Sequence, residues 1–180
     1  ANGDDAGALA LYLAHRRTVA AGYSSAYVQA IRAAATEQQR SAARDELTRA
    51  FSGLTTVCPR VLLRGVTEEV FFLGATAETL AAFGHAVADY APEWPKASWG
   101  TAGALARLLP MMLAVPECPD AALIPPMAWM LTACEGEWNW SRTWDETMLG
   151  VAGHNWWLNT WLGLFTAGAF FPEFPALRRF

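Results

Sequence analysis

The segment GHNWWLNTW, at residues 153–161, holds the side chains best suited to chemistry. It places one histidine, two asparagines and three tryptophans within nine residues, among them His154, Asn155 and Asn159. Amides donate hydrogen bonds to carboxylates and hydroxyls, and an indole offers a large apolar face with one N–H donor. Because the C–H groups of a sugar lie against aromatic faces while its hydroxyls need polar partners, this pattern favours carbohydrate recognition.

Tryptophan is concentrated in the second half of the chain. The sequence has nine tryptophans, and seven of them lie between residues 129 and 161. Core packing is the expected role of Trp129, Trp157 and Trp161. For four others core packing and ligand binding stay equally open, because small polar residues flank several of them. These four are Trp99, Trp138, Trp140 and Trp156.

One helix should present the asparagines. On an ideal helix with about 100° per residue, Asn155, Asn159 and Thr166 lie within about 40° of one another. The apolar residues at 157, 161 and 164 fall on the opposite side, so we expect an apolar seam and a separate amide–hydroxyl stripe. Structural roles stay open for two of these residues as alternatives to ligand binding. Asn155 suits a helix N-cap, and His154 suits a structural histidine whose hydrogen bonds are made within the fold.

The elements around this segment are predicted to be helices of one all-α domain over residues 1–180. Hydrophobic residues make up 53% of the chain and charged residues 17%, a composition that supports a substantial core. Residues 137–153 should be irregular or only partly helical, and Pro110 should kink or break its helix. Caps and apolar spacing predict six to eight helices, which include residues 4–17, 24–31, 36–51, 76–91, 101–114, 120–136 and 153–171.

Several function classes are excluded by composition. A net charge of −4 and a pI near 5.3 lack the excess of basic residues that is typical of a nucleic-acid-binding protein. No apolar run reaches the roughly 18–20 residues that a membrane span needs. The three cysteines, Cys58, Cys118 and Cys134, form no C-x-x-C pair, so we expect buried thiols and no metal or redox cofactor. The acid pairs at 68/69 and 135/137 are interpreted as side chains on solvent-exposed faces. The cellular compartment of the protein stays open.

Two longer segments resemble a known family. The stretch GHNWWLNTWLGLFTAGAFFPEFPALRRF, residues 153–180, is similar to the conserved segment of the heparinase II/III-like polysaccharide lyases. In that family Gly-x-Asn-(His or Trp) opens an apolar helix that ends in Phe-Pro-Glu-Phe. Upstream, ASWGTAGALARLLPMMLAV, residues 97–115, resembles the inner helix of the family that carries an arginine. The similarity extends over residues 60–180 and is looser before them.

The resemblance implies an incomplete (α/α) toroid, built from helical hairpins, that cleaves uronic-acid polysaccharides by β-elimination. Donors that neutralise the uronate carboxylate make the neighbouring C5 proton removable, because they relieve the charge of the developing enolate. By resemblance Asn155 is the carboxylate-neutralising residue. The substrate-binding residues implied with it are His154, Trp156, Trp99, Arg107 and, on the same helical stripe, Asn159.

The chain also departs from the family pattern. The family's catalytic tyrosine follows the asparagine helix, whereas here no tyrosine follows Tyr90 and the sequence ends at Phe180. We therefore expect the N-terminal portion of a toroid, or a degenerate relative, that is inactive alone and self-associates through an exposed edge. Between Ser98 and Leu177 the only cations are Arg107 and Arg142, which favours heparan-like or alginate-like polymers over highly sulfated ones.

Two alternatives remain beside a lyase. One is a non-catalytic carbohydrate-binding or scaffold helical domain. The other is a helical protein-interaction module whose aromatic residues all belong to the core.

Overall fold

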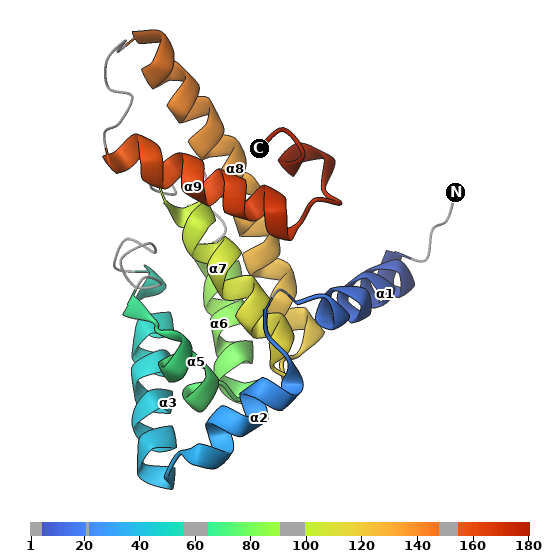
Figure 1. The fold of residues 1–180 in the computed structure, drawn as a ribbon, viewed down its shortest axis with the longest axis vertical. Helices are drawn as coiled ribbons and strands as arrows, with labels where there is room; N and C mark the ends of the chain where they lie inside the picture. The colour runs from blue at the N-terminus through green and yellow to red at the C-terminus, as the bar shows by residue number, and fades with distance from the viewer. Residues whose placement is uncertain (1–4, 21, 56–64, 91–99, 148–154) are drawn as a thin grey trace.

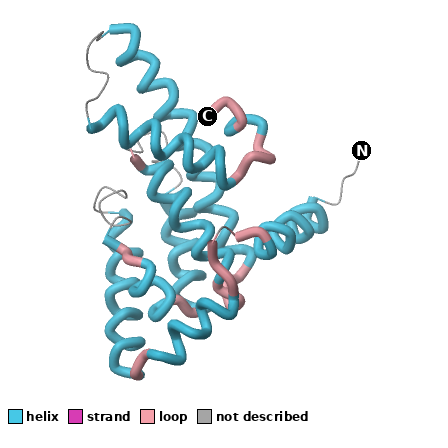
Figure 2. Tube along the Cα trace, viewed as in Figure 1, coloured by secondary structure: helices cyan, strands magenta, loops and turns pink. Residues whose placement is uncertain are grey.

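The computed structural model describes residues 5–20, 22–55, 65–90, 100–147 and 155–180. Within these ranges the chain forms eight α-helices and two short 3-10 helices and contains no β-strand, which confirms the all-α class (Figure 2). In chain order the elements are α1 (Asp5–Thr18), α2 (Ser25–Ala34), α3 (Glu37–Ser52), η1 (Gly53–Thr55), α5 (Glu68–Gly74), α6 (Ala77–Tyr90), α7 (Thr101–Ala114), α8 (Asp120–Thr147), α9 (Asn155–Phe170) and η3 (Pro175–Leu177).

The predicted helix starts are confirmed where a side chain caps the first turn. The hydroxyl of Ser24 accepts from the backbone N–H of Tyr27 at 3.2 Å. Thr36 and Gln39 form the reciprocal capping box that their spacing predicts. Thr76 accepts from the N–H of Thr79 at 3.2 Å at the start of α6. Local sequence therefore determines where these helices begin.

Of the kink or break predicted at Pro110, the break is wrong, because α7 runs continuously from Thr101 to Ala114. A proline inside a helix costs about 3 kcal/mol, since it removes one hydrogen bond and crowds the preceding turn. Twelve of the 14 residues of α7 are buried. Burying a single large apolar side chain contributes about 1.5–3 kcal/mol, so packing outweighs the local cost.

The stretch 137–153 is predicted to be irregular or only partly helical. The irregular alternative is wrong as far as Thr147, and residues 148–154 lie outside the described residues. The helix α8 continues through it to Thr147 and is 28 residues long. Trp138 packs edge-on against Trp161 of α9, with ring centroids 5.5 Å apart. Contacts with α7, α9 and the C-terminal segment thus keep this polar stretch helical, which residue type alone did not indicate.

Three helices form the centre of the molecule (Figure 1). The helix α8 packs against both α6 and α7, and α9 crosses α7 and α8 at one end of this group. The helices α2, α3 and α5 pack together at the other end. The core joins both regions through ring contacts such as that between Phe51 and Phe83, whose centroids lie 4.3 Å apart.

The first helix projects from this body and is held by arginines (Figure 1). Arg17 donates to the carbonyl of Cys118 and to the carboxylate of Asp120, both at 2.7 Å. Arg16 is buried, donates to the carbonyl of Phe170 and lies 3.4 Å from the Glu173 carboxylate. The end of α9 is therefore anchored to α1.

None of the described helices alone is both long enough and apolar enough to cross a bilayer, although the bent pair α5 and α6 has the length and composition of a span when the two helices are taken together.

Candidate functional site

The two helices that carry the predicted site residues, α7 and α9, touch at a pair of glycines. A Cβ built on Gly103 would lie 2.9 Å from the Cα of Gly163, closer than real Cβ contacts allow. Only residues without a side chain permit this approach of one backbone to the other. The crossing places the arginine helix and the asparagine helix against each other.

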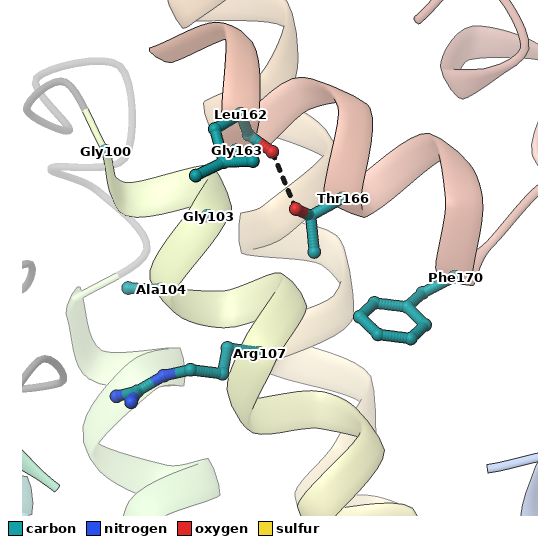
Figure 3. A pocket seen from close by; sticks show the side chains of 8 residues that line it. All are labelled: Gly100, Gly103, Ala104, Arg107, Leu162, Gly163, Thr166 and Phe170. Carbon is teal, nitrogen blue, oxygen red and sulfur yellow. Dashed lines mark hydrogen bonds between the residues drawn. The ribbon is translucent and has the colours of Figure 1, made fainter. Parts of the chain in front are cut away.

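A pocket of about 340 Å³ lies beside this crossing (Figure 3). Four of its lining residues come from the N-cap and first half of α7, and four come from the middle and end of α9. They are Gly100, Gly103, Ala104, Arg107, Leu162, Gly163, Thr166 and Phe170. The small residues leave the space open, and the larger ones supply one guanidinium, one hydroxyl and one aromatic ring.

Arg107 lines the pocket, and its guanidinium also has a structural partner. Its Nη2 donates to the carbonyl of Val66 at 3.1 Å. In Figure 3 the side chain extends away from Thr166 and Phe170. Arg107 thus ties α7 to the segment before α5 while it stands at the edge of the pocket.

On α9 the pocket lies along the face that the sequence predicts to be polar. Thr166 donates its hydroxyl proton to the carbonyl of Leu162 at 2.6 Å, so its lone pairs remain acceptors for a ligand. Phe170 adds a partly buried ring. By helical register the backbone positions of Asn155 and Asn159 lie on this same face, about three and two turns before Thr166.

A buried carboxylate caps the helix that carries Arg107. Gly100, the N-cap of α7, has a positive φ of 80° and makes no side-chain cap. Instead Glu137 of α8 accepts from the N–H of Ala102 at 2.9 Å, and its side chain is only 3% exposed. The solvated interpretation of the acid pair at 135/137 is therefore wrong for Glu137, whereas Glu135 is exposed and pairs with Arg179.

Sequence reasoning missed this cap because it depends on a contact between helices. The one local signal was a glycine in front of α7 where a capping side chain is usual. The N-terminus of a helix attracts a carboxylate, since its first N–H groups lack partners within the helix. Glu137 supplies that partner from 35 residues away in sequence.

Three of the described tryptophans, Trp129, Trp138 and Trp161, pack against other aromatic rings of the molecule. Trp129 is fully buried, as predicted, and its ring lies 5.3 Å from that of Tyr90. Trp138, for which binding and packing were both open, packs between Trp161 and Phe180. These contacts assign Trp138 to the packing of α8 against α9 and the C-terminal segment.

Several predicted site residues lie at the edge of what the structure describes. Trp99 and His154 fall outside the described residues, directly before Gly100 and Asn155. Asn155, Trp156 and Asn159 belong to the helical backbone of α9, with Asn155 as its first residue.

The buried-thiol prediction is confirmed for two cysteines, and Cys58 lies outside the described residues. Burial raises the pKa of Cys118 to about 11 and that of Cys134 to about 12. In the described part of the chain no group of three or more His, Cys, Asp or Glu side chains is placed to hold a metal ion.

Comparison of the chain with protein-family models, curated proteins and solved structures finds no match. The site therefore rests on its own geometry.

Proposed function

We propose that this chain is the N-terminal toroid portion of a lyase that cleaves uronic-acid polysaccharides by β-elimination. The observation that carries the proposal is the crossing of α7 and α9 beside one pocket. The two segments that resemble the lyase family supply these two helices, although they are separated in sequence by α8. Arg107 and Thr166 line the pocket, one from each helix.

In this proposal Asn155 neutralises the carboxylate of the bound uronate. Asn155 is the first residue of α9, where backbone N–H groups without helical partners favour an anion. Hydrogen bonds to the carboxylate strengthen as charge develops at the adjacent carbon, which lowers the barrier to removal of the C5 proton. No residue of this chain is assigned to proton transfer itself.

The substrate class follows from the small number of cations. Arg107 is the single charged residue that lines the pocket among the described residues. One guanidinium matches one carboxylate per sugar, whereas dense sulfation would require more positive charge. We therefore propose a heparan-like or alginate-like polymer, with Phe170 against the apolar face of one sugar and the helices arranged as an incomplete (α/α) toroid.

A non-catalytic carbohydrate-binding domain is the second candidate. The observation that favours it is the bond from Arg107 to the carbonyl of Val66, which gives the arginine a structural role. In that case the Phe170 ring and the Thr166 hydroxyl of the pocket hold a saccharide, and no group of the pocket polarises the carboxylate of that saccharide.

Tryptophan fluorescence titration with unsulfated uronate oligosaccharides tests the proposal, with neutral oligosaccharides of equal length as ligand controls. We expect saturable binding that Asn155→Ala and Asn159→Ala each weaken about tenfold, because each loses a hydrogen bond to a charged group. Asn139→Ala, which removes an exposed amide from α8, should leave affinity unchanged. Absence of uronate binding, or equal binding of neutral sugars, would overturn the proposal.

A further inference from the structure

A second pocket lies between α2, α3 and α5 and shares no residue with the pocket beside α9. Its volume is about 440 Å³. Its lining includes Tyr27 and Ile31 of α2, Gln39 of α3, and Glu68, Glu69 and Leu73 of α5. The lining thus combines apolar side chains with two carboxylates.

An aromatic cluster holds the ring of Tyr27 in place at this pocket. The ring stands edge-on to Phe72, with centroids 5.9 Å apart, and lies 6.2 Å from the ring of Tyr23. Tyr27 is nevertheless 44% exposed. A fixed aromatic ring with an accessible surface is a binding element for a cation, because the ring face carries negative charge density.

Glu68 and Glu69 give the pocket its charge. Glu68 accepts a hydrogen bond from the hydroxyl of Tyr23 at 2.5 Å, which orients the carboxylate and leaves its other lone pairs for a ligand. Glu69 lies beside it, exposed to solvent. No lysine or arginine is present among the described residues that line this pocket.

The arginines of the neighbouring pocket bind other groups of the protein. Arg32, Arg40 and Arg44 line a separate pocket with Glu117 and Glu78. Arg32 is bound to Glu117 and to the carbonyl of Ala75, at 2.9 and 2.7 Å. The arginines of that neighbouring pocket are therefore bound to other groups, whereas Arg107 lies close enough to Tyr23 to act on the pKa of its hydroxyl. The pocket at Tyr27 is itself lined by two carboxylates and by no cationic side chain among the described residues.

We propose that this acidic, aromatic pocket binds a primary ammonium group carried on an aliphatic stem, as in an alkylamine or a lysine side chain. The ammonium lies between Glu68, Glu69 and the ring of Tyr27, where charge-assisted hydrogen bonds and the cation–π interaction add. The stem packs against Ile31 and Leu73, as long cationic side chains cover apolar surfaces elsewhere.

The test is an amide chemical-shift titration of the whole chain with hexylammonium, with 1-hexanol as the neutral ligand of the same shape. We expect saturable shifts at Ile31, Glu69 and Leu73 and about tenfold weaker binding of hexanol, because only the ammonium has charged partners. The variant E68Q/E69Q should bind hexylammonium about tenfold more weakly. This double variant keeps a side-chain oxygen at residue 68 that accepts the hydrogen bond from the Tyr23 hydroxyl, so we expect the fold to be preserved.

The matched control is D45N/E46Q, which removes two neighbouring acids from the exposed face of α3 and should leave affinity unchanged. Equal binding of hexanol and hexylammonium, an effect of both double variants alike, or shifts confined to other regions would overturn the proposal.

A further titration with N-acetyl-lysine methylamide identifies the source of the ammonium group. Tighter binding of the lysine derivative than of hexylammonium would support a polypeptide source, and the reverse order would support a free amine. Failure of both to bind would overturn the site. None of these residues lines the α7–α9 pocket, so the result is independent of the proposed lyase function.

Discussion

Gly103 of α7 and Gly163 of α9 lie in direct backbone contact, so that a Cβ added to Gly163 would stand 2.9 Å from the N atom of Gly103. This contact brings Arg107 and Thr166 to the same pocket. The candidate site therefore depends on two residues that have no side chain.

The first prediction concerns this contact. Gly163→Ala should lower the free energy of unfolding by about 1–3 kcal/mol, because neither backbone can move away without loss of packing. Urea unfolding followed by circular dichroism measures the change. Gly136→Ala is the matched control, since Gly136 is exposed in α8 with no atom near its would-be Cβ. The control should stabilise by about 0.5–1 kcal/mol, and equal effects of both substitutions would refute the close contact.

The anchor of α1 gives the second prediction. The Tyr12 hydroxyl donates to Glu173 at 2.6 Å, across 161 residues of sequence. Tyr12→Phe should cost about 1–2 kcal/mol of unfolding free energy, since the bond has a charged acceptor. Tyr27→Phe, which removes a hydroxyl from an exposed side chain, should cost little. Similar losses in the two variants would argue against the anchor.

The same bond predicts a pH dependence. Burial and the bond to Glu173 raise the pKa of Tyr12 above its usual value. The unfolded tyrosine ionises near pH 10 while the folded one stays protonated, so this contribution is complete below about pH 10 and is lost as the pH rises further. Unfolding measured from pH 8 upwards should show a steeper alkaline loss in the wild type than in Tyr12→Phe. Parallel curves would contradict the assignment.

Glu137 carries the fourth prediction. Glu137→Ala removes the acceptor for the Ala102 N–H and leaves that group buried, at a cost of about 1–3 kcal/mol. Glu137→Gln keeps an oxygen at the same place and should recover most of the loss. Thermal unfolding of the two variants measures the difference. If the glutamine variant is as unstable as the alanine variant, the cap is not the main role of Glu137.

The outer face of α9 supports the expectation of self-association. Leu158, Leu162 and Phe165 are 52%, 63% and 61% exposed, and α9 contains no charged residue. An uncharged apolar face of this kind favours contact with another apolar surface. Sedimentation velocity should show association that rises with concentration and that L162S/F165S weakens about tenfold. Leu11→Ser, at a residue 75% exposed on α1, is the control, and a monomer at all concentrations would contradict the prediction.

The sequence allowed the helices to be predicted where the signals are local. Ser24, Thr36 and Thr76 cap helices at the expected residues, because a cap bonds within one turn. The helix predicted at 101–114 has these bounds in the structure, but its continuity through Pro110, like that of α8 through Trp138, does not follow from local signals. It depends on burial against helices that local sequence does not reveal.

The candidate site was predictable in part for the same reason. Helical spacing placed Thr166 on the face of the asparagines, and the structure puts Thr166 in the pocket. Spacing could not reveal the partner of Arg107 at Val66, nor the buried cap from Glu137, because both bonds join separate elements. Nor did it indicate the acidic pocket at Tyr27, which three helices build together.

Amide chemical shifts during titration with an unsulfated uronate oligosaccharide test whether the α7–α9 pocket binds an acidic saccharide. Glycine amides are convenient reporters, since they lie both at the pocket and away from it. We expect saturable shifts at Gly100, Gly103 and Gly163, with Gly84 and Gly136 unchanged. Shifts that avoid the three pocket glycines, or no shifts at saturating saccharide, would contradict this expectation.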